Sequence, residues 1–145
     1  MPFLFLFCFS FSAHAAQSTE MSQALRTVQA EVAGHGFTVV AEEPFVVVGD
    51  ESPETVRRRA ASTVRWAVHH LKKSYFPKNP KRVLTVWLFK DKHSYEKHTW
   101  KFWRYKPSTP FGYYSPREGA LVMNIATGGG TLVHEIVHPF MSSNF

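Results

Sequence analysis

The sequence lacks several features that would place a chain in a class at once. Its 145 residues include one cysteine, Cys8, so no disulfide can form within the chain. Its most apolar segment, residues 1–11, is too short to span a membrane, which takes about 20 residues. There is no internal repeat. The chain is 44% hydrophobic and 15% aromatic, enough at this length for one core and hardly for two, so we expect a single domain.

The N-terminal segment has the composition of a secretory signal. Residues 1–11 are almost wholly apolar and lead into Ala13-His14-Ala15, which has the small-x-small form of a signal-peptidase site. The alternative, a buried N-terminal strand, would leave its many Phe side chains no solvent face. We therefore predict a signal peptide over residues 1–15 with cleavage after Ala15, a domain over residues 16–145, and a secreted or periplasmic location, with no membrane span left after cleavage.

Basic residues are concentrated in the middle of the chain. Residues 57–106 hold 15 of the 17 Lys and Arg residues and 2 of the 11 Asp and Glu residues, within a net charge of +6. In residues 97–106 aromatic residues alternate with cations, a pattern that could stack single-stranded nucleic acid or sugar. For an exported protein we favour a solvated basic face, drawn to anionic envelope polymers, over nucleic-acid binding.

Hydrophobic periodicity predicts an α+β fold with a small mixed sheet packed by helices. Helical patterns cover residues 18–34, residues 52–76 with Ser52 as N-cap, and residues 91–105 with Asp91 as N-cap. Short β-rich runs cover residues 37–40, 45–48 and 82–89, and a hairpin covers residues 113–126. The run over residues 82–89 is apolar on both faces, which is typical of a central strand.

The last predicted helix carries the residues with the clearest chemistry. On a helix His134 and His138 lie about 40° apart and about 6 Å along the axis, so both imidazoles can bind one ion. Neutral imidazoles leave Zn²⁺ able to lower the pKa of a bound water to about 7. Glu135 lies beside this pair, where its carboxylate can take the proton of that water as general base. The alternative is a core helix that carries two histidines by chance. It would bury two His and one Glu without a metal, which is energetically unfavourable.

The pattern His134-Glu135-x-x-His138 resembles the H-E-x-x-H signature of the zincin metallopeptidases. The metzincin branch is excluded, because Met141 and Asn144 stand where its extension has Gly and His. The chain is similar to the gluzincin, peptidase-MA-like branch found in secreted bacterial proteins. This resemblance implies a zincin-like N-terminal subdomain and a zinc-dependent endopeptidase or aminopeptidase acting on a peptide or protein substrate by means of a metal-activated water.

In the gluzincin branch the third ligand is a Glu on a later helix. Residues 139–145 contain no His, Asp or Glu, so we expect the third ligand and the other wall of the cleft to lie beyond Phe145. Pro139 should clash with the carbonyl of Glu135 and kink or end the helix there. With two protein ligands zinc would be held weakly. The alternative function is a non-catalytic envelope- or polyanion-binding module that uses the basic face.

Zincin folds place an edge strand beside the metal helix, where an extended peptide can bind as an added strand. We expect residues 121–125 to form this edge. Asn124 could then bind the substrate backbone, although an Asn that ends a strand at a turn is the commoner case. Tyr113 or Tyr114 could steady an oxyanion, but nothing in the sequence places either near the zinc. We expect the remaining candidate histidines to lie on the surface: His69, His70, His93 and His98.

Overall fold

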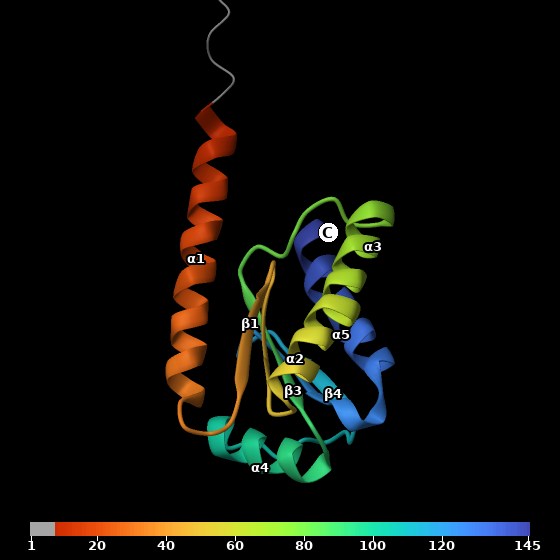
Figure 1. The fold of residues 1–145 in the computed structure, drawn as a ribbon. Helices are drawn as coiled ribbons and strands as arrows, with labels where there is room; N and C mark the ends of the chain where they lie inside the picture. The colour runs from red at the N-terminus through yellow and green to blue at the C-terminus, as the bar shows by residue number, and fades with distance from the viewer. Residues whose placement is uncertain (1–7) are drawn as a thin grey trace, which may run out of the picture.

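The computed structural model describes residues 8–145, with side chains from His14 onward, and has a five-stranded mixed sheet between two layers of helices (Figure 1). The strand order is β1-β2-β3-β5-β4. β2, β3 and β5 run parallel, and β1 and β4 pair antiparallel at the two edges. This arrangement confirms the α+β class with a small mixed sheet. The strands are β1 Thr38–Glu42, β2 Phe45–Gly49, β3 Leu84–Phe89, β4 Gly112–Ser115 and β5 Ala120–Asn124.

The helices follow the predicted order along the chain. They are α1 Cys8–Val32, α2 Pro53–Arg59, α3 Arg65–Ser74, α4 Lys92–Trp103 and α5 Gly129–Asn144. A π-helical turn, η1 Ala60–Val64, joins α2 to α3, and a 3₁₀ turn, η2 Ile125–Thr127, precedes α5. In the part of the chain that the structure describes, no helix combines the length and the apolar character needed to cross a membrane.

The predicted helix starts at Ser52 and Asp91 are confirmed. Ser52 accepts a hydrogen bond from the Thr55 amide at 3.2 Å, and Asp91 accepts one from the Ser94 amide at 2.8 Å. Such side chains satisfy amides that have no partner within the helix. The first helix, in contrast, begins at Cys8 and not at residue 18 as predicted. Residues 1–7 of the predicted signal peptide lie outside the described residues.

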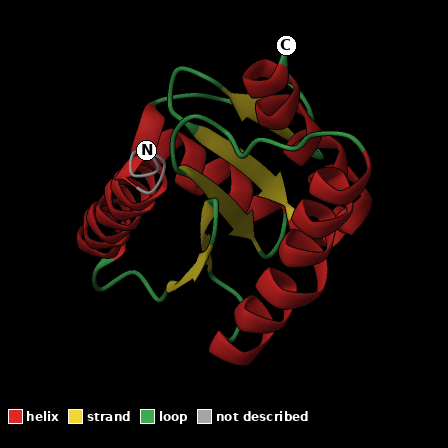
Figure 2. Cartoon of the chain, turned by 90° about the horizontal axis from the view of Figure 1, so that it is seen from above, coloured by secondary structure: helices red, strands yellow, loops and turns green. Residues whose placement is uncertain are grey.

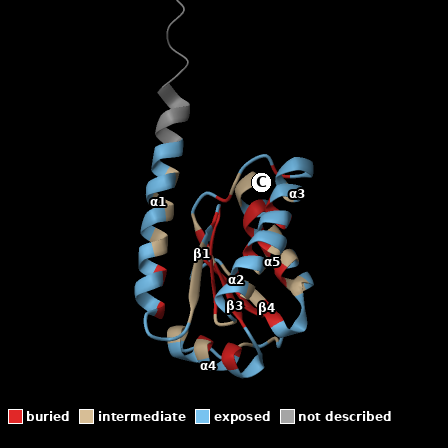
Figure 3. Ribbon diagram, in the orientation of Figure 1, coloured by how far each residue is buried: buried red, intermediate tan, exposed pale blue. Residues whose placement is uncertain are grey.

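Each face of the sheet is covered by its own set of helices. Figure 2 shows the sheet between α1 on one side and α2, α3 and α5 on the opposite side. α1 and α4 pack on the face that carries Trp87 and Phe89, whereas α2, α3 and α5 pack on the face that carries Val86 and Leu88. Buried residues accordingly run along both faces of the central strand (Figure 3). β3 is therefore the central strand that its two apolar faces predicted.

The predicted edge strand is wrong. β5, which covers most of residues 121–125, pairs with β3 on one side and β4 on the other, and all its residues are buried. The first strand of the hairpin, β4, forms the edge instead. The reason is a non-local pairing, since β5 runs parallel to β3 from Thr85 opposite Ala120 to Phe89 opposite Asn124.

Pro139 was predicted to kink or end the last helix, and it does not end it. α5 continues through Pro139 to Asn144, and the proline ring is buried. Proline removes one helical hydrogen bond, but tertiary packing supplies most of a helix's stability in a protein. Here Phe140 is fully buried and its ring lies 6.4 Å from Phe45 and 6.2 Å from Phe76, centroid to centroid.

Candidate metal centre

The candidate centre lies on the face of α5 that is turned away from the core. α5 begins after Gly128, whose φ of 106° is a conformation that side chains other than glycine rarely adopt. Leu132 and Ile136 are fully buried against the sheet. The helical period then leaves His134 and His138 on the solvent side, with ring centroids 5.3 Å apart.

His134, Glu135 and His138 each offer a ligand atom, and these atoms all lie within 4.8 Å of one another. Within the described residues no other set of three His, Cys, Asp or Glu side chains meets in this way. The side chain of His138 is 46% exposed and that of Glu135 is 14% exposed. Glu135 Oε2 lies 3.6 Å from His138 Nε2. The predicted grouping of the two imidazoles and the carboxylate on one accessible face is thus observed.

The donor set fits zinc in type. Imidazole nitrogen and carboxylate oxygen are ordinary Zn²⁺ donors, at about 2.0–2.2 Å from the ion. Two donors of a tetrahedral site therefore lie about 3.4 Å apart. The ligand atoms here lie within 4.8 Å of one another, and small rotations of the side chains would bring them to that shorter separation. A catalytic zinc site normally has three protein ligands, of which His134 and His138 would supply two.

Tyr114 is a neighbour of the centre that sequence analysis did not place. Its ring on β4 is parallel to the imidazole of His138, with the centroids 6.1 Å apart and the planes inclined by 10°. Tyr113 faces the other side of the sheet, where its ring meets Tyr105 at 5.3 Å. Burial raises the pKa of Tyr113, and the neighbouring Tyr105 adds to this. Strand alternation requires two successive tyrosines to face opposite sides, but the sequence alone does not say which one faces α5.

Asn124 makes the contacts of a turn residue. It is 4% exposed; its Nδ2 donates to the Pro110 carbonyl at 3.1 Å, and its Oδ1 accepts from the Ala126 amide at 3.2 Å. Both polar groups therefore hold the two loops together at the end of β5. The structure describes the second of the two alternatives left open for this residue, and substrate binding by Asn124 stays a prediction.

The remaining histidines do not join the centre. His69, His70 and His93 are exposed, as predicted. His98 is not a surface residue: it is half-buried, and its ring stacks on Phe89 at 5.3 Å and on Phe102 at 5.8 Å. The prediction failed because α4 turns this side of its surface toward β3.

The structure thus brings His134, Glu135 and His138 together. Tyr114 contacts this group, and Asn124 makes hydrogen bonds within a turn. Comparison of the chain with models of protein families, with curated proteins and with solved structures finds no match in any of the three. The case for a function is therefore argued from the geometry of these residues.

Proposed function

We propose that the chain is part of a zinc-dependent metallopeptidase of gluzincin type, in which His134 and His138 hold the ion and Glu135 is the general base. The observation that supports this most is the meeting of their ligand atoms within 4.8 Å on an accessible face of α5. Zinc, when bound, supplies polarisation of the scissile carbonyl and a water whose pKa is lowered to about 7.

Glu135 is suited to proton transfer by its position. Its side chain is 14% exposed, so bulk water reaches it less than it reaches His138 at 46%. The carboxylate accepts a proton from the attacking water and then donates it to the leaving amine. His134 and His138 accept no proton in this scheme, because the lone pairs of the neutral imidazoles are the metal ligands.

The free edge of the sheet offers a place for the substrate. The Asn124 amide donates to the Phe111 carbonyl at 3.0 Å. Along an antiparallel pair, successive residues direct their main-chain groups alternately toward the partner strand and away from it. The main-chain groups of Tyr113 then face β5, Gly112 is buried, and the main-chain groups of Tyr114 face outward. An extended peptide could pair with these outward groups as an added strand. Because Tyr114 lies against His138, a peptide bound there would lie beside the histidines.

The proposal needs a third zinc ligand. Residues 139–145 have no His, Asp or Glu that could serve. A Glu from a segment outside residues 1–145 is the ligand that the gluzincin resemblance implies. Until it is supplied, binding through His134 and His138 alone should be weak, because catalytic zinc sites normally use three protein ligands.

The experiment measures zinc content and peptide cleavage together. Titrated with excess zinc, wild type should bind about one ion per chain with weak affinity, and a variant with both His134→Ala and His138→Ala should bind none. In a protein that includes the third ligand, Glu135→Gln should keep the zinc and lose cleavage by a factor of about 10² to 10⁴. Glu96→Gln, on the exposed side of α4, is the matched control and should change neither. Equal zinc binding in wild type and the double histidine variant, or equal cleavage in wild type and Glu135→Gln, overturns the proposal.

One observation favours the non-catalytic alternative, a module that binds an anionic envelope polymer. Arg65, Lys72 and Lys73 line a shallow surface of α3 together with His69. If this surface carries the function, Lys72→Gln with Lys73→Gln should weaken retention on a polyanion column and leave zinc content unchanged. The metallopeptidase proposal expects the same double variant to cleave peptides as wild type does.

A further inference from the structure

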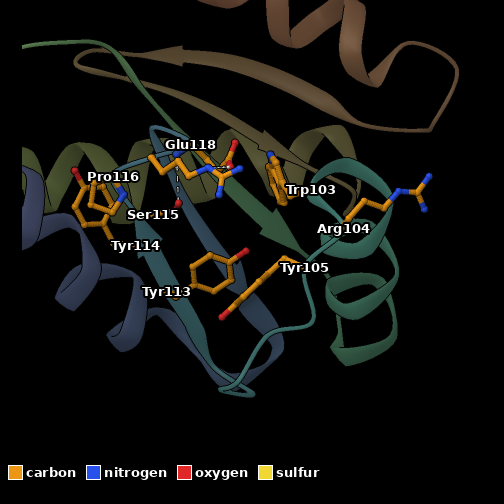
Figure 4. A pocket seen from close by; sticks show the side chains of 9 residues that line it. Trp103, Arg104, Tyr105, Tyr113, Tyr114, Ser115, Pro116 and Glu118 are labelled. Atoms are coloured by element: carbon orange, nitrogen blue, oxygen red, sulfur yellow. Dashed lines mark hydrogen bonds and ion pairs between the residues drawn. The ribbon is translucent and has the colours of Figure 1, made fainter.

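An open pocket of about 450 Å³ lies beside the free edge strand, between the C-terminal end of α4 and the β4–β5 hairpin (Figure 4). Tyr113 reaches it from β4, Trp103 reaches it from the last residue of α4, and Tyr105 reaches it from the loop after that helix. Tyr113 faces the α4 side of the sheet, the opposite side from His138. The aromatic wall formed by Trp103, Tyr105 and Tyr113 and the candidate metal centre thus lie on opposite faces of the same edge strand, and Tyr114 borders both.

The walls of the pocket are aromatic and held in place by the core. Trp103 meets the buried Trp87 edge-on, with centroids 5.2 Å apart and planes at 89°. Tyr105 and Tyr113 meet at 5.3 Å and 62°, and Tyr105 is 42% exposed. Figure 4 shows these two rings side by side, with Tyr114 on the other side of β4. Ring faces and edges in such an arrangement are available to a further aromatic ring.

Charge contributes less to this pocket than the rings do. Arg117 Nε lies 3.4 Å from Glu118 Oε1, so the two charges at the hairpin largely offset each other. The third charged residue of the lining, Arg104, points away from the two tyrosines (Figure 4), with its guanidinium carbon 5.8 Å from the centroid of the Trp100 ring. An acidic or basic ligand group would have to compete with this existing pair. The hydroxyl groups of Tyr105 and Tyr113 form no hydrogen bond with other residues of the described chain, so they can accept or donate one at the rim.

Strand alternation connects the pocket to the substrate path of the proposed peptidase. Side chains directly opposite each other on paired strands point to the same face, and successive side chains point to opposite faces. A peptide paired with β4 would therefore direct the side chain opposite Tyr113 into the pocket. Its two neighbours would point to the α5 face, where Tyr114 and His138 lie.

From this we infer that the pocket is a specificity site, which accepts a large aromatic side chain next to the substrate residue held at the histidines. The inference rests on the proposed function, because it takes the extended peptide on β4 as the ligand. An aromatic side chain can meet Tyr105 and Tyr113 edge-to-face, whereas an alanine side chain in the same place meets neither ring.

The test measures binding and not cleavage. Two blocked seven-residue peptides of Ala and Thr, one with Phe and one with Ala at the centre, are titrated by calorimetry into Glu135→Gln in a chelator. The Phe peptide should bind about tenfold more tightly than the Ala peptide. Tyr105→Ala should remove this difference and Tyr105→Phe should restore it. Tyr75→Ala, at a residue that is 73% exposed on the end of α3, is the control and should keep it.

The outcomes separate the inference from the proposed function. Equal binding of the two peptides, or an unchanged preference in Tyr105→Ala with a native circular dichroism spectrum, overturns the aromatic specificity site. A tenfold preference that depends on Tyr105 supports it. The same preference in a protein whose zinc binding is unchanged by His134→Ala with His138→Ala supports the pocket and overturns the peptidase.

Discussion

The ring of Tyr114 on the edge strand lies parallel to the imidazole of His138 on α5, at a centroid distance of 6.1 Å. α5 itself is fixed on the sheet by fully buried Leu132, Ile136 and Phe140. The helix therefore fixes the position of the His138 backbone, and the Tyr114 ring restricts rotation of the His138 imidazole. Residues that hold a ligating imidazole in its orientation also affect the affinity of the site for the metal.

Removing the Tyr114 ring should weaken zinc binding. Tyr114→Ala should raise the dissociation constant for zinc by about tenfold, the lower end of the range for residues that support a ligand. Tyr114→Phe keeps the ring and should bind as wild type does. Competition with a chromophoric chelator measures both constants. Unchanged affinity in Tyr114→Ala, or a loss in Tyr114→Phe equal to that in Tyr114→Ala, would show that the stacked ring does not position His138.

His98 should make stability depend on pH. Burial lowers the pKa of its imidazole, and this outweighs the hydrogen bond to the Ser94 carbonyl and the nearby charge of Asp50, which raise it. The unfolded chain, with a His pKa of about 6.5, then takes up a proton that the folded chain resists. Stability contributed by neutral His98 is fully present above about pH 6.5 and is lost as pH falls through that value toward the lower folded pKa.

The measurement is the urea midpoint at several pH values between about 5 and 8, where histidine titrates. The urea midpoint of His98→Gln should fall less steeply with decreasing pH than the midpoint of wild type. His93→Gln, an exposed histidine on the same helix, should keep the wild-type slope. Identical slopes in wild type and His98→Gln would assign the pH dependence to other groups.

Local features were the ones that the sequence predicted well. The caps at Ser52 and Asp91 depend on a few consecutive residues, and both are observed. The pairing of His134 with His138 depends only on the helical period, and it is observed too. The prediction that β3 is a central strand depends only on a short run that is apolar on both faces, and this run is visible within six residues.

Features that depend on non-local packing were not predictable in this way. β4 is the edge only because β5 pairs with β3, which precedes it by some thirty residues along the chain. His98 is half-buried only because α4 meets Phe89 of that strand. Tyr114 reaches His138 for the same reason as β4 is the edge. The helix period alone also could not show that packing around Phe140 would carry α5 past Pro139.

The continuation of α5 beyond Pro139 should be visible in stability. Phe140 is fully buried and packs on Phe45 and Phe76. Phe140→Ala should lower the free energy of unfolding by about 3–5 kcal/mol. The next residue, Met141, is 47% exposed, and Met141→Ala should change it by less than about 0.5 kcal/mol. Chemical denaturation of both variants gives the comparison. Equal, small effects would mean that residues after Pro139 do not pack as a helix on the core.

The predicted cleavage after Ala15 makes a further prediction, about α1. The N-terminal part of this helix projects beyond the sheet (Figure 1), and residues 14–16 are exposed. The contacts with the body begin further along, where Glu20 accepts a hydrogen bond from the Val83 amide at 2.8 Å and Val28 and Val32 are buried. His14 and Ala15, the described side chains of the segment that cleavage would remove, therefore contribute little packing.

A chain that starts at Ala16 should melt within about 2 °C of the full chain, since 1 kcal/mol shifts Tm by only about 2–8 °C in domains of this size range. Val28→Asp in that shortened chain should lower Tm well beyond this margin, because it puts a charge without a partner against the sheet. Val28→Ala serves as the milder control. Thermal melts followed by circular dichroism compare the four proteins. A large drop in Tm from the deletion alone would make residues 1–15 part of the folded domain and remove the signal-peptide prediction.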